Sequence, residues 1–208
     1  MANEAPLPTP LRLVTAPEDL ELVKRCVAGE RPAQRELFAR ERKHVHWTLF
    51  RILGHSQHLE DLIQDTFLEI FRSLGSFRGE SLLSTWVERC TVRVAYAYFR
   101  RKALVPRLEP VHDVLNAAPS AEQRVMHREA ARRLYALLDR LEPSQRIAYT
   151  LHLLDNKPLK EVASLMQASL VTTKVRVFRA RRTIERRAEN DPLLSEFVLS
   201  PSPPSRKS

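Results

Sequence analysis

Glycine is scarce in this chain of 208 residues, where it occurs only four times. That is roughly 2%, against a usual frequency of about 7%. Neither G-x-G-x-x-G nor G-x-x-x-x-G-K occurs, which excludes the common phosphate-binding loops of nucleotide-binding proteins. Few tight β-turns are expected, and the abundant Leu, Ala, Arg and Glu favour helix. The sequence therefore predicts an all-α protein.

Cysteine and long apolar runs are also scarce. Cys26 and Cys90 form neither a disulfide framework nor a C-x-x-C or zinc spacing. No run approaches the roughly 18 to 20 apolar residues of a membrane span, and residues 1–10 lack the features of a signal peptide. We expect a reduced, cytoplasmic protein with no membrane insertion.

Motifs of catalysis and metal binding are missing as well. No G-x-S-x-G is present, so no nucleophile motif accompanies the Ser, His and Asp residues. The pairs His44 and His46, or His55 and His58, lack an H-E-x-x-H motif or nearby cysteine ligands. We expect no catalytic residue, no metal, no cofactor and no enzymatic activity.

Prolines divide the chain. They gather before residue 18, between residues 103 and 119, and after residue 200, and each discourages helix at itself and at the preceding residue. The expected fold is two small helical domains joined by a flexible linker. The expected segments are a disordered tail (1–17), an N-terminal domain (18–102), a linker (103–119), a C-terminal domain (120–190) and a C-terminal tail (191–208). Leu193, Leu194, Phe197 and Val198 of that tail either pack on the second domain or a partner, or stay free.

Apolar periodicity predicts the individual helices. In the N-terminal domain they cover 20–27, 32–53, 59–74 and 82–102, and a loop is expected after residue 74. In the C-terminal domain a capping box at 120–123 opens a helix to about 141, and Pro143 suits the first turn of the next. Asn156 can take the left-handed conformation in the turn 155–158.

The end of the C-terminal domain has the arrangement of a helix-turn-helix. A short helix is predicted at 159–166, a three-residue turn at 167–169, and a long helix at 170–187, with Ser169 as its N-cap. Such a pair places its second helix in the major groove of duplex DNA. This pattern favours DNA as a partner.

The positive charge is confined to two helices. The chain has 34 basic and 25 acidic residues, a net charge of +9. Residues 169–187 hold seven basic residues and one acidic residue, and residues 86–102 hold five and one. These two segments therefore carry +6 and +4, and the remainder is close to neutral. Each phosphate neutralised by such a helix releases counterions, so we expect nucleic-acid binding that weakens steeply with salt.

The two basic segments differ in composition. In 86–102 the basic residues alternate with Trp86, Tyr96, Tyr98 and Phe99. Aromatic planes beside arginine suit unstacked bases better than intact duplex, although at least one of these rings is expected in the core. The first basic helix is thus a candidate for single-stranded DNA and the second for duplex.

Taken in order, these segments resemble the extracytoplasmic-function (ECF) group of bacterial RNA polymerase sigma factors. The resemblance extends over about residues 18–187. It rests on EDLIQDTF at 60–67, FRGES at 77–81, STWV at 84–87, FRR at 99–101, LEPSQR at 141–146, EVA at 161–163 and TTKVRVFRAR at 172–181.

The resemblance implies a role for each segment. The family contacts core polymerase with the positions matching Asp61, Leu62, Gln64, Asp65 and Phe67. It captures the melted minus-ten element with those matching Phe77, Arg78, Ser81, Trp86, Arg89, Arg93, Arg100 and Arg101. It reads the minus-thirty-five element with those matching Thr172, Thr173, Lys174, Val175, Arg176, Phe178 and Arg179. The implied partners are core RNA polymerase, promoter DNA and an anti-sigma factor.

Four positions depart from the family pattern. Gln167 stands where Gly is usual in the turn of the helix-turn-helix, at a cost of about 1 kcal/mol if its φ is positive. Arg93 and Ala97 replace an Asn and an Asp of the minus-ten helix, and Val175 replaces a Ser of the reading helix. Unusual promoter preferences are expected.

Two other functions are compatible with the sequence. One is a stand-alone helix-turn-helix regulator that binds duplex DNA without polymerase. The other is a protein that binds polymerase or an anti-sigma factor but has lost promoter activity, which the altered minus-ten helix would permit. Transcription from a promoter library, with and without core polymerase, separates these possibilities.

Overall fold

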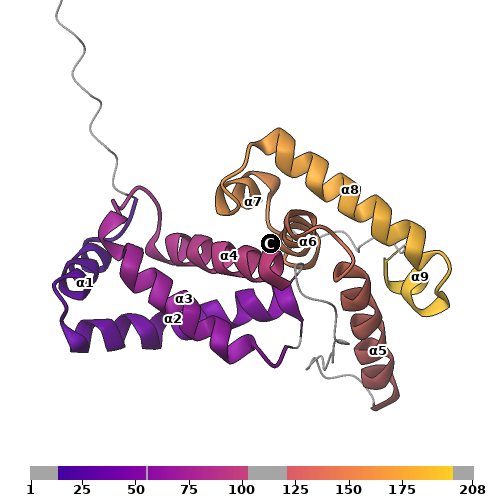
Figure 1. Cartoon of the computed structure of the whole chain (residues 1–208), viewed down its shortest axis with the longest axis horizontal. Helices are drawn as coiled ribbons and strands as arrows, with labels where there is room; N and C mark the ends of the chain where they lie inside the picture. The colour runs from indigo at the N-terminus through magenta and orange to yellow at the C-terminus, as the bar shows by residue number, and fades with distance from the viewer. Residues whose placement is uncertain (1–13, 55, 103–120, 199–208) are drawn as a thin grey trace, which may run out of the picture.

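The structure is a computed structural model that describes residues 14–54, 56–102 and 121–198. Their regular elements are all helical, and Figure 1 shows them in two groups. We call residues 14–102 the N-terminal half and residues 121–198 the C-terminal half. No helix within the described ranges is long and apolar enough to cross a membrane.

Four α-helices and a 3-10 turn make up the N-terminal half. They are α1 (Pro17–Val27), α2 (Arg31–Leu53), α3 (Leu59–Ser73), η1 (Leu74–Ser76) and α4 (Leu83–Lys102). Glycines with positive φ, Gly29 and Gly54, follow α1 and α2 and allow the chain to turn. The apolar stripes of α2, α3 and α4 pack together around fully buried residues such as Leu49, Ile70 and Val87. This packing fixes which faces of α3 and α4 remain exposed.

The C-terminal half contains five α-helices and a short π-helix. They are α5 (Ala121–Leu138), α6 (Pro143–Tyr149), η2 (Thr150–Leu154), α7 (Leu159–Leu165), α8 (Leu170–Ala188) and α9 (Pro192–Val198). The Glu142 carboxylate caps α6 by accepting hydrogen bonds from the backbone N–H groups of Ser144 (3.0 Å) and Gln145 (3.2 Å). Helix α9 packs against α5 and α8 and buries Leu194, so this part of the predicted tail joins the helical group.

The local predictions for the second half can be compared residue by residue. Ser169 is the N-cap of α8, and its Oγ accepts a hydrogen bond from the Thr172 N–H at 3.0 Å, as predicted. Asn156 has φ +52°, also as predicted, and Gln167 has φ +49°. Helix α5 ends three residues earlier than predicted, and the π-helix was not predicted.

Several predictions fall outside the described residues. The predicted linker 103–119, Ser120 of the capping box and most of the N-terminal tail are among them. At the end of that tail, however, Val14 and Thr15 donate backbone hydrogen bonds to the Gly79 carbonyl, at 2.9 and 3.3 Å. Thr15 also donates through its hydroxyl to the Ser81 carbonyl. These two residues therefore hold the loop that precedes α4.

The two halves meet where α2 ends. The last carbonyls of a helix lack partners within the helix, and here side chains of the C-terminal half donate to them. Tyr135 Oη donates to the Arg51 carbonyl at 2.7 Å. Arg146 donates to the carbonyls of Ile52 and Leu53, at 3.0 and 2.9 Å. A cation at the end of a helix also interacts favourably with the helix dipole.

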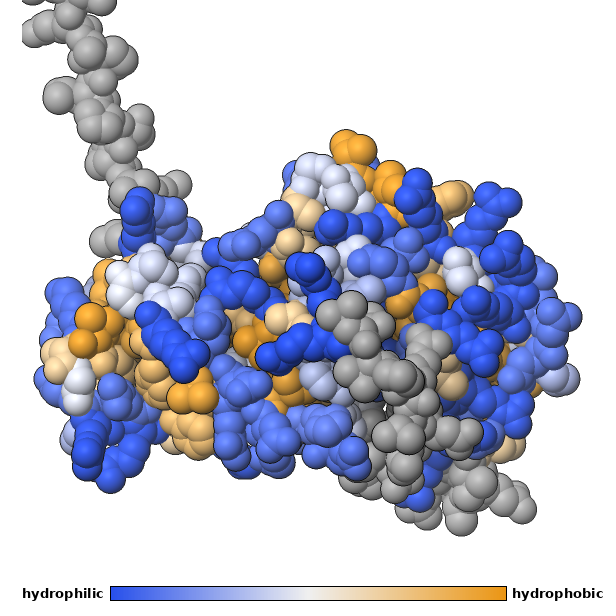
Figure 2. Space-filling view, in the orientation of Figure 1, coloured by the Kyte–Doolittle hydropathy of each residue, from blue (hydrophilic) through white to orange (hydrophobic). Residues whose placement is uncertain are grey.

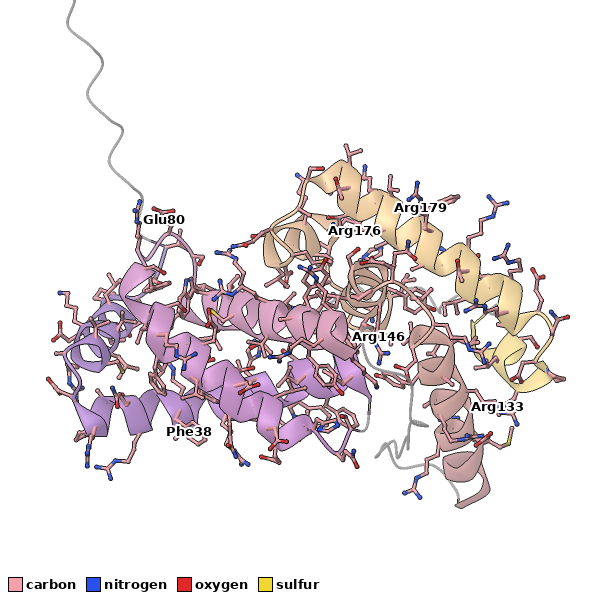
Figure 3. All side chains as sticks on the ribbon, viewed as in Figure 1. Phe38, Glu80, Arg133, Arg146, Arg176 and Arg179 are labelled. Atoms are coloured by element: carbon pink, nitrogen blue, oxygen red, sulfur yellow. The ribbon has the colours of Figure 1, made fainter. Side chains whose placement is uncertain are left out.

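Arg146 is almost fully buried in this contact (2% exposed). Its guanidinium lies 4.4 Å from the centre of the Phe99 ring of α4 and pairs with Asp139. Burial lowers the pKa of Arg146 and the Asp139 carboxylate opposes that change, and an arginine remains charged in proteins. Figure 3 shows this side chain in the region where the two halves meet.

Candidate nucleic-acid interface

Helix α3 presents an acidic face to solvent. Asp61, Gln64 and Asp65 are exposed, and the spacing of three and four residues places them on one side of the helix. Leu62 and Phe67, predicted to belong to the same site, are buried in the core and hold the helix in place. Leu68 is 53% exposed and extends the acidic face by one turn. The sequence pattern did not predict that Leu68 is exposed, because a leucine beside an apolar stripe is expected in the core.

The loop before α4 brings two predicted minus-ten residues together. The rings of Phe77 and Trp86 meet edge to face with their centres 5.7 Å apart, and both are partly buried. Arg78, which follows Phe77 in the sequence, is exposed, and Ser81 is held through its backbone carbonyl by Thr15. An aromatic pair with an adjacent exposed arginine is suited to a flipped base and its phosphate.

Helix α4 carries a face of arginine and aromatic side chains. Trp86, Arg89, Arg93 and Arg100 follow one another at three-, four- and seven-residue spacings, so they lie along one side of the helix. Arg93 is exposed but bonded to Glu69 of α3 at 2.5 Å. Arg101 lies 4.0 Å from Asp65, which turns it toward the acidic face of α3. Two of the predicted minus-ten arginines, Arg93 and Arg101, therefore lie beside acidic residues of α3.

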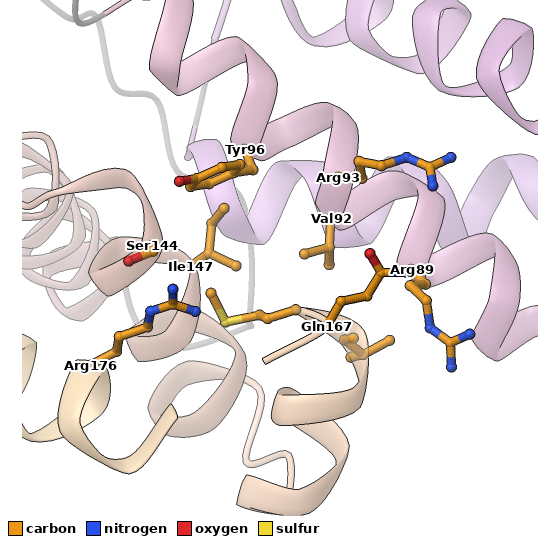
Figure 4. A pocket seen from close by; sticks show the side chains of 10 residues that line it. Arg89, Val92, Arg93, Tyr96, Ser144, Ile147, Gln167 and Arg176 are labelled. Carbon is orange, nitrogen blue, oxygen red and sulfur yellow. The ribbon is translucent and has the colours of Figure 1, made fainter. Parts of the chain in front are cut away.

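A groove of about 270 Å³ runs between α4 and the C-terminal half. Figure 4 shows its lining, which combines an apolar floor with arginines from both sides. Arg89, Arg93 and Tyr96 come from α4, and Arg176 comes from α8. Arg89 also donates a hydrogen bond across the junction to Ser164 Oγ, at 3.2 Å. Arg176 thus points toward the other half, whereas Arg179 is exposed.

Helix α8 has a buried side and an exposed side. Thr173 and Val177 face the core, and the Thr173 hydroxyl donates to the Ser169 carbonyl at 3.0 Å. Because Thr173 is fully buried, its side chain is not part of the exposed surface. Thr172 is exposed at the start of the helix. Lys174, Val175, Phe178 and Arg179 are exposed together, as Figure 3 shows for Arg179.

The turn before α8 is made without glycine. Gln167 takes the left-handed conformation, and its N–H donates to the Ser164 carbonyl at 3.2 Å. The Ala168 N–H donates to the Ala163 carbonyl at 2.9 Å. These bonds close the end of α7 and aim α8 away from it, so α7, the turn and α8 form a helix-turn-helix.

Comparisons with known proteins agree with this arrangement. A family model of sigma-70 region 2 matches residues 37–105, and one of sigma-70 region 4 matches residues 131–184. Together the two matches span more than half of the chain. The first contains α3 and α4, and the second contains the helix-turn-helix.

Curated relatives match along nearly their whole length. An "ECF RNA polymerase sigma-E factor" of Haemophilus influenzae is 28% identical over 181 residues, 82% of this chain and 95% of the relative. An "RNA polymerase sigma-H factor" of Pseudomonas aeruginosa is 26% identical over 197 residues, 88% of this chain and all of the relative.

Solved structures share the fold. CnrH in complex with the cytosolic domain of CnrY aligns with a TM-score of 0.54 and 18% identity, over 83% of this chain and 98% of that one. The sigma factor RpoE bound to the anti-sigma factor NepR, from Bartonella quintana, aligns with a TM-score of 0.55 and 18% identity, over 76% and 97%. With both sigma-70 regions present in order and relatives of matching length, the chain belongs to the extracytoplasmic-function group of RNA polymerase sigma factors.

Proposed function

We propose that three separate faces carry out the work of this sigma factor, which binds core RNA polymerase, recognises promoter DNA and helps to melt it. The acidic face of α3 contacts polymerase, the aromatic and arginine face of α4 holds the melted minus-ten strand, and the exposed side of α8 enters the major groove at the minus-thirty-five element. The observation that supports this assignment best is the charge: +4 and +6 lie on α4 and α8, with an acidic helix beside the first.

The polymerase contact consists of Asp61, Gln64, Asp65 and Leu68. Carboxylates surrounding one exposed leucine suit a basic helical surface with an apolar centre, because charge steers the encounter and the leucine supplies the desolvated contact. Leu62 and Phe67 support this face from below.

The minus-ten strand contacts Phe77, Arg78, Trp86, Arg89 and Arg100. The rings supply stacking surfaces for unpaired bases, and the arginines neutralise the phosphates between them. Arg93 takes part once it leaves Glu69, which makes this bond part of the cost of binding DNA.

The C-terminal half contacts duplex DNA through Thr172, Lys174, Val175, Phe178 and Arg179. Residues at the start of a recognition helix read base edges, and exposed cations along it bind phosphate. We assign residues 18–102 to the polymerase and minus-ten domain, 120–190 to the minus-thirty-five domain and 103–119 to the segment that joins them.

An anti-sigma factor is a further proposed partner, since CnrH and RpoE, which share this fold, were both solved in complexes. Sigma factors carry out no covalent chemistry themselves, and we propose that this chain is likewise not an enzyme. We place its action in the cytoplasm, where polymerase and promoters are.

Transcription in vitro tests the polymerase assignment. We expect Asp61→Arg with Asp65→Arg to abolish promoter-specific transcripts from core polymerase and to weaken core binding at least tenfold. The control is Glu21→Arg, an exposed glutamate on α1, which should leave both unchanged. If the Asp61→Arg, Asp65→Arg double variant binds core polymerase as tightly as the Glu21→Arg control, the assignment of α3 to the polymerase contact is contradicted.

The two sigma-70 regions and the curated relatives favour the sigma factor over the stand-alone regulator. If the purified chain binds specific duplexes tightly in the absence of core and gives no transcripts in its presence, the regulator replaces the sigma factor assignment.

A further inference from the structure

The exposed side of α8 has an apolar centre. Val171, Val175 and Phe178 are 71%, 41% and 63% exposed. They follow one another at spacings of four and three residues, so they lie within about 60° of each other around the helix. We call these three side chains the apolar row. Figure 2 shows hydrophobic surface over the start of α8, with hydrophilic surface further along the helix.

Cations border the apolar row on both sides. Lys174 and Arg179 are exposed on the two flanks of the apolar row. Arg182 is exposed beyond its C-terminal end, on the same side of the helix. Within the described residues, no ion pair joins these three cations to an acidic side chain. An apolar strip between free cations matches the major groove, which presents apolar methyl groups between two phosphate backbones.

The side chains of the apolar row contain no hydrogen-bond donor or acceptor. Direct reading of guanine or adenine uses Arg, Lys, Asn or Gln, whereas the thymine C5-methyl group is read by apolar contact. Arg176, the arginine nearest the middle of the row in sequence, points into the groove beside α4 instead. The centre of the reading surface is therefore suited to thymine rather than to guanine.

We propose that Val171, Val175 and Phe178 read thymine methyl groups, so that the minus-thirty-five element of this sigma factor carries thymines at successive contact positions. This specificity rests on the proposed function of α8. The row is about 10.5 Å long, given a rise of 1.5 Å per residue, and therefore spans about three base-pair steps of 3.4 Å. Thymines are expected within a stretch of about four base pairs, with Lys174 and Arg179 on the flanking phosphates.

The test begins by selecting promoters. Core polymerase loaded with the full chain selects active promoters from a library randomised across the minus-thirty-five element. Each thymine of the selected element is then replaced by deoxyuridine, which keeps the base pair and removes only the methyl group. We expect about fourfold weaker promoter binding at each contacted thymine, the value of one buried methyl group, and no change at thymines outside the element.

Alanine variants assign each methyl group to a side chain. Val175→Ala should abolish the effect of deoxyuridine at one position and leave it intact at the others, and Phe178→Ala should do the same at a different position. Both side chains are exposed, so both variants should unfold at the wild-type temperature. Lys174→Ala is the matched control: it should weaken thymine and uracil promoters equally and reduce the salt dependence.

Three outcomes overturn the proposal while leaving the sigma factor assignment intact. They are a selected element without thymine, equal binding of thymine and uracil promoters, and weaker binding of Val175→Ala to core polymerase without DNA, which would make the row a protein contact. Failure to select any promoter would instead contradict the proposed function itself.

Discussion

The two halves of the molecule bury their apolar residues differently. The core of the N-terminal half is one continuous cluster from α1 to α4. The C-terminal half is divided: Tyr135, Leu138 and Ile184 belong to a cluster of their own, whereas Ile147 and Leu151 join the core of the N-terminal half. The core of the first half therefore extends across the junction, and the second half shares part of its apolar core with the first.

The largest effect is expected from breaking that junction at Arg146. Replacing it with alanine removes the cation that pairs with the part-buried Asp139 and the side chain that donates to the carbonyls of Ile52 and Leu53. Loss of one partner of a buried pair costs about 3–5 kcal/mol. Urea denaturation should show this loss, and hydrogen exchange should show it in α6 before α3.

Arg133→Ala is the matched control for Arg146. This arginine is 40% exposed and pairs with Glu129 and Asp191 within the C-terminal half. Exposed pairs contribute little to stability, because solvent screens the two charges. If both variants lose the same stability, the junction is no more important than an ordinary surface pair.

The second prediction concerns the glycine that ends α2. A Cβ at Gly54 would lie 2.8 Å from the Tyr135 ring, and its φ of +73° is unfavourable for alanine. Overpacking costs about 1–3 kcal/mol. The backbone conformation at Gly54, with φ +73° and ψ −157°, is essentially confined to glycine and adds about 1 kcal/mol or more, so Gly54→Ala should lose at least about 2 kcal/mol.

A second glycine provides a control that has no ring contact. Gly29 has φ +85° and nothing within 4 Å of its Cβ position, so Gly29→Ala carries the backbone cost alone, about 1 kcal/mol. Thermal unfolding of both variants gives the difference. Equal losses would mean that Tyr135 moves aside and that the two halves adapt to each other freely.

The sequence does not predict these contacts between the two halves. Proline, glycine and apolar periodicity locate the helices, and Ser169 and Asn156 take their expected roles, because these signals are local. The burial of Thr173, the exposure of Leu68 and the direction of Arg176 depend on residues far away in sequence. The π-helix at 150–154 also has no strong local signal.

A third prediction uses the left-handed turn of the helix-turn-helix. Gln167→Gly should stabilise the protein by about 0.5–1 kcal/mol, since glycine has no Cβ penalty at φ +49° but loses more entropy on folding. Asn156→Gly is the control at φ +52°, where asparagine is already tolerated, and should gain less. Equal gains at both positions would refute the idea that Gln167 is the strained member of the pair.

The smallest effect concerns acid. Hydrogen bonds from Arg132 and then Arg133 lower the pKa of Glu129 to about 2. A carboxyl group with a lowered folded-state pKa stabilises the protein above its unfolded pKa, about 4.3, and loses that contribution as the pH falls toward 2. Because Glu129 is one-third exposed, the effect is modest.

Melting temperatures of the wild type and Glu129→Gln should therefore differ at pH 6, and this difference should disappear as the pH falls through 2. The variant Glu21→Gln, in the N-terminal half, measures the effect of losing an exposed glutamate elsewhere. If the difference in melting temperature between the wild type and Glu129→Gln stays constant across this pH range, the lowered pKa of Glu129 is contradicted.

The shared placement of Arg146 limits how this protein can be recombined with its relatives. Its guanidinium is bonded to carbonyls of the first half, stacked on Phe99 and paired with Asp139 of the second half. A chimera that joins either half to the corresponding part of another sigma factor keeps this arrangement only if that part supplies the matching groups. A hybrid therefore preserves the junction when its second half has an arginine at position 146 and its first half has an aromatic ring at position 99.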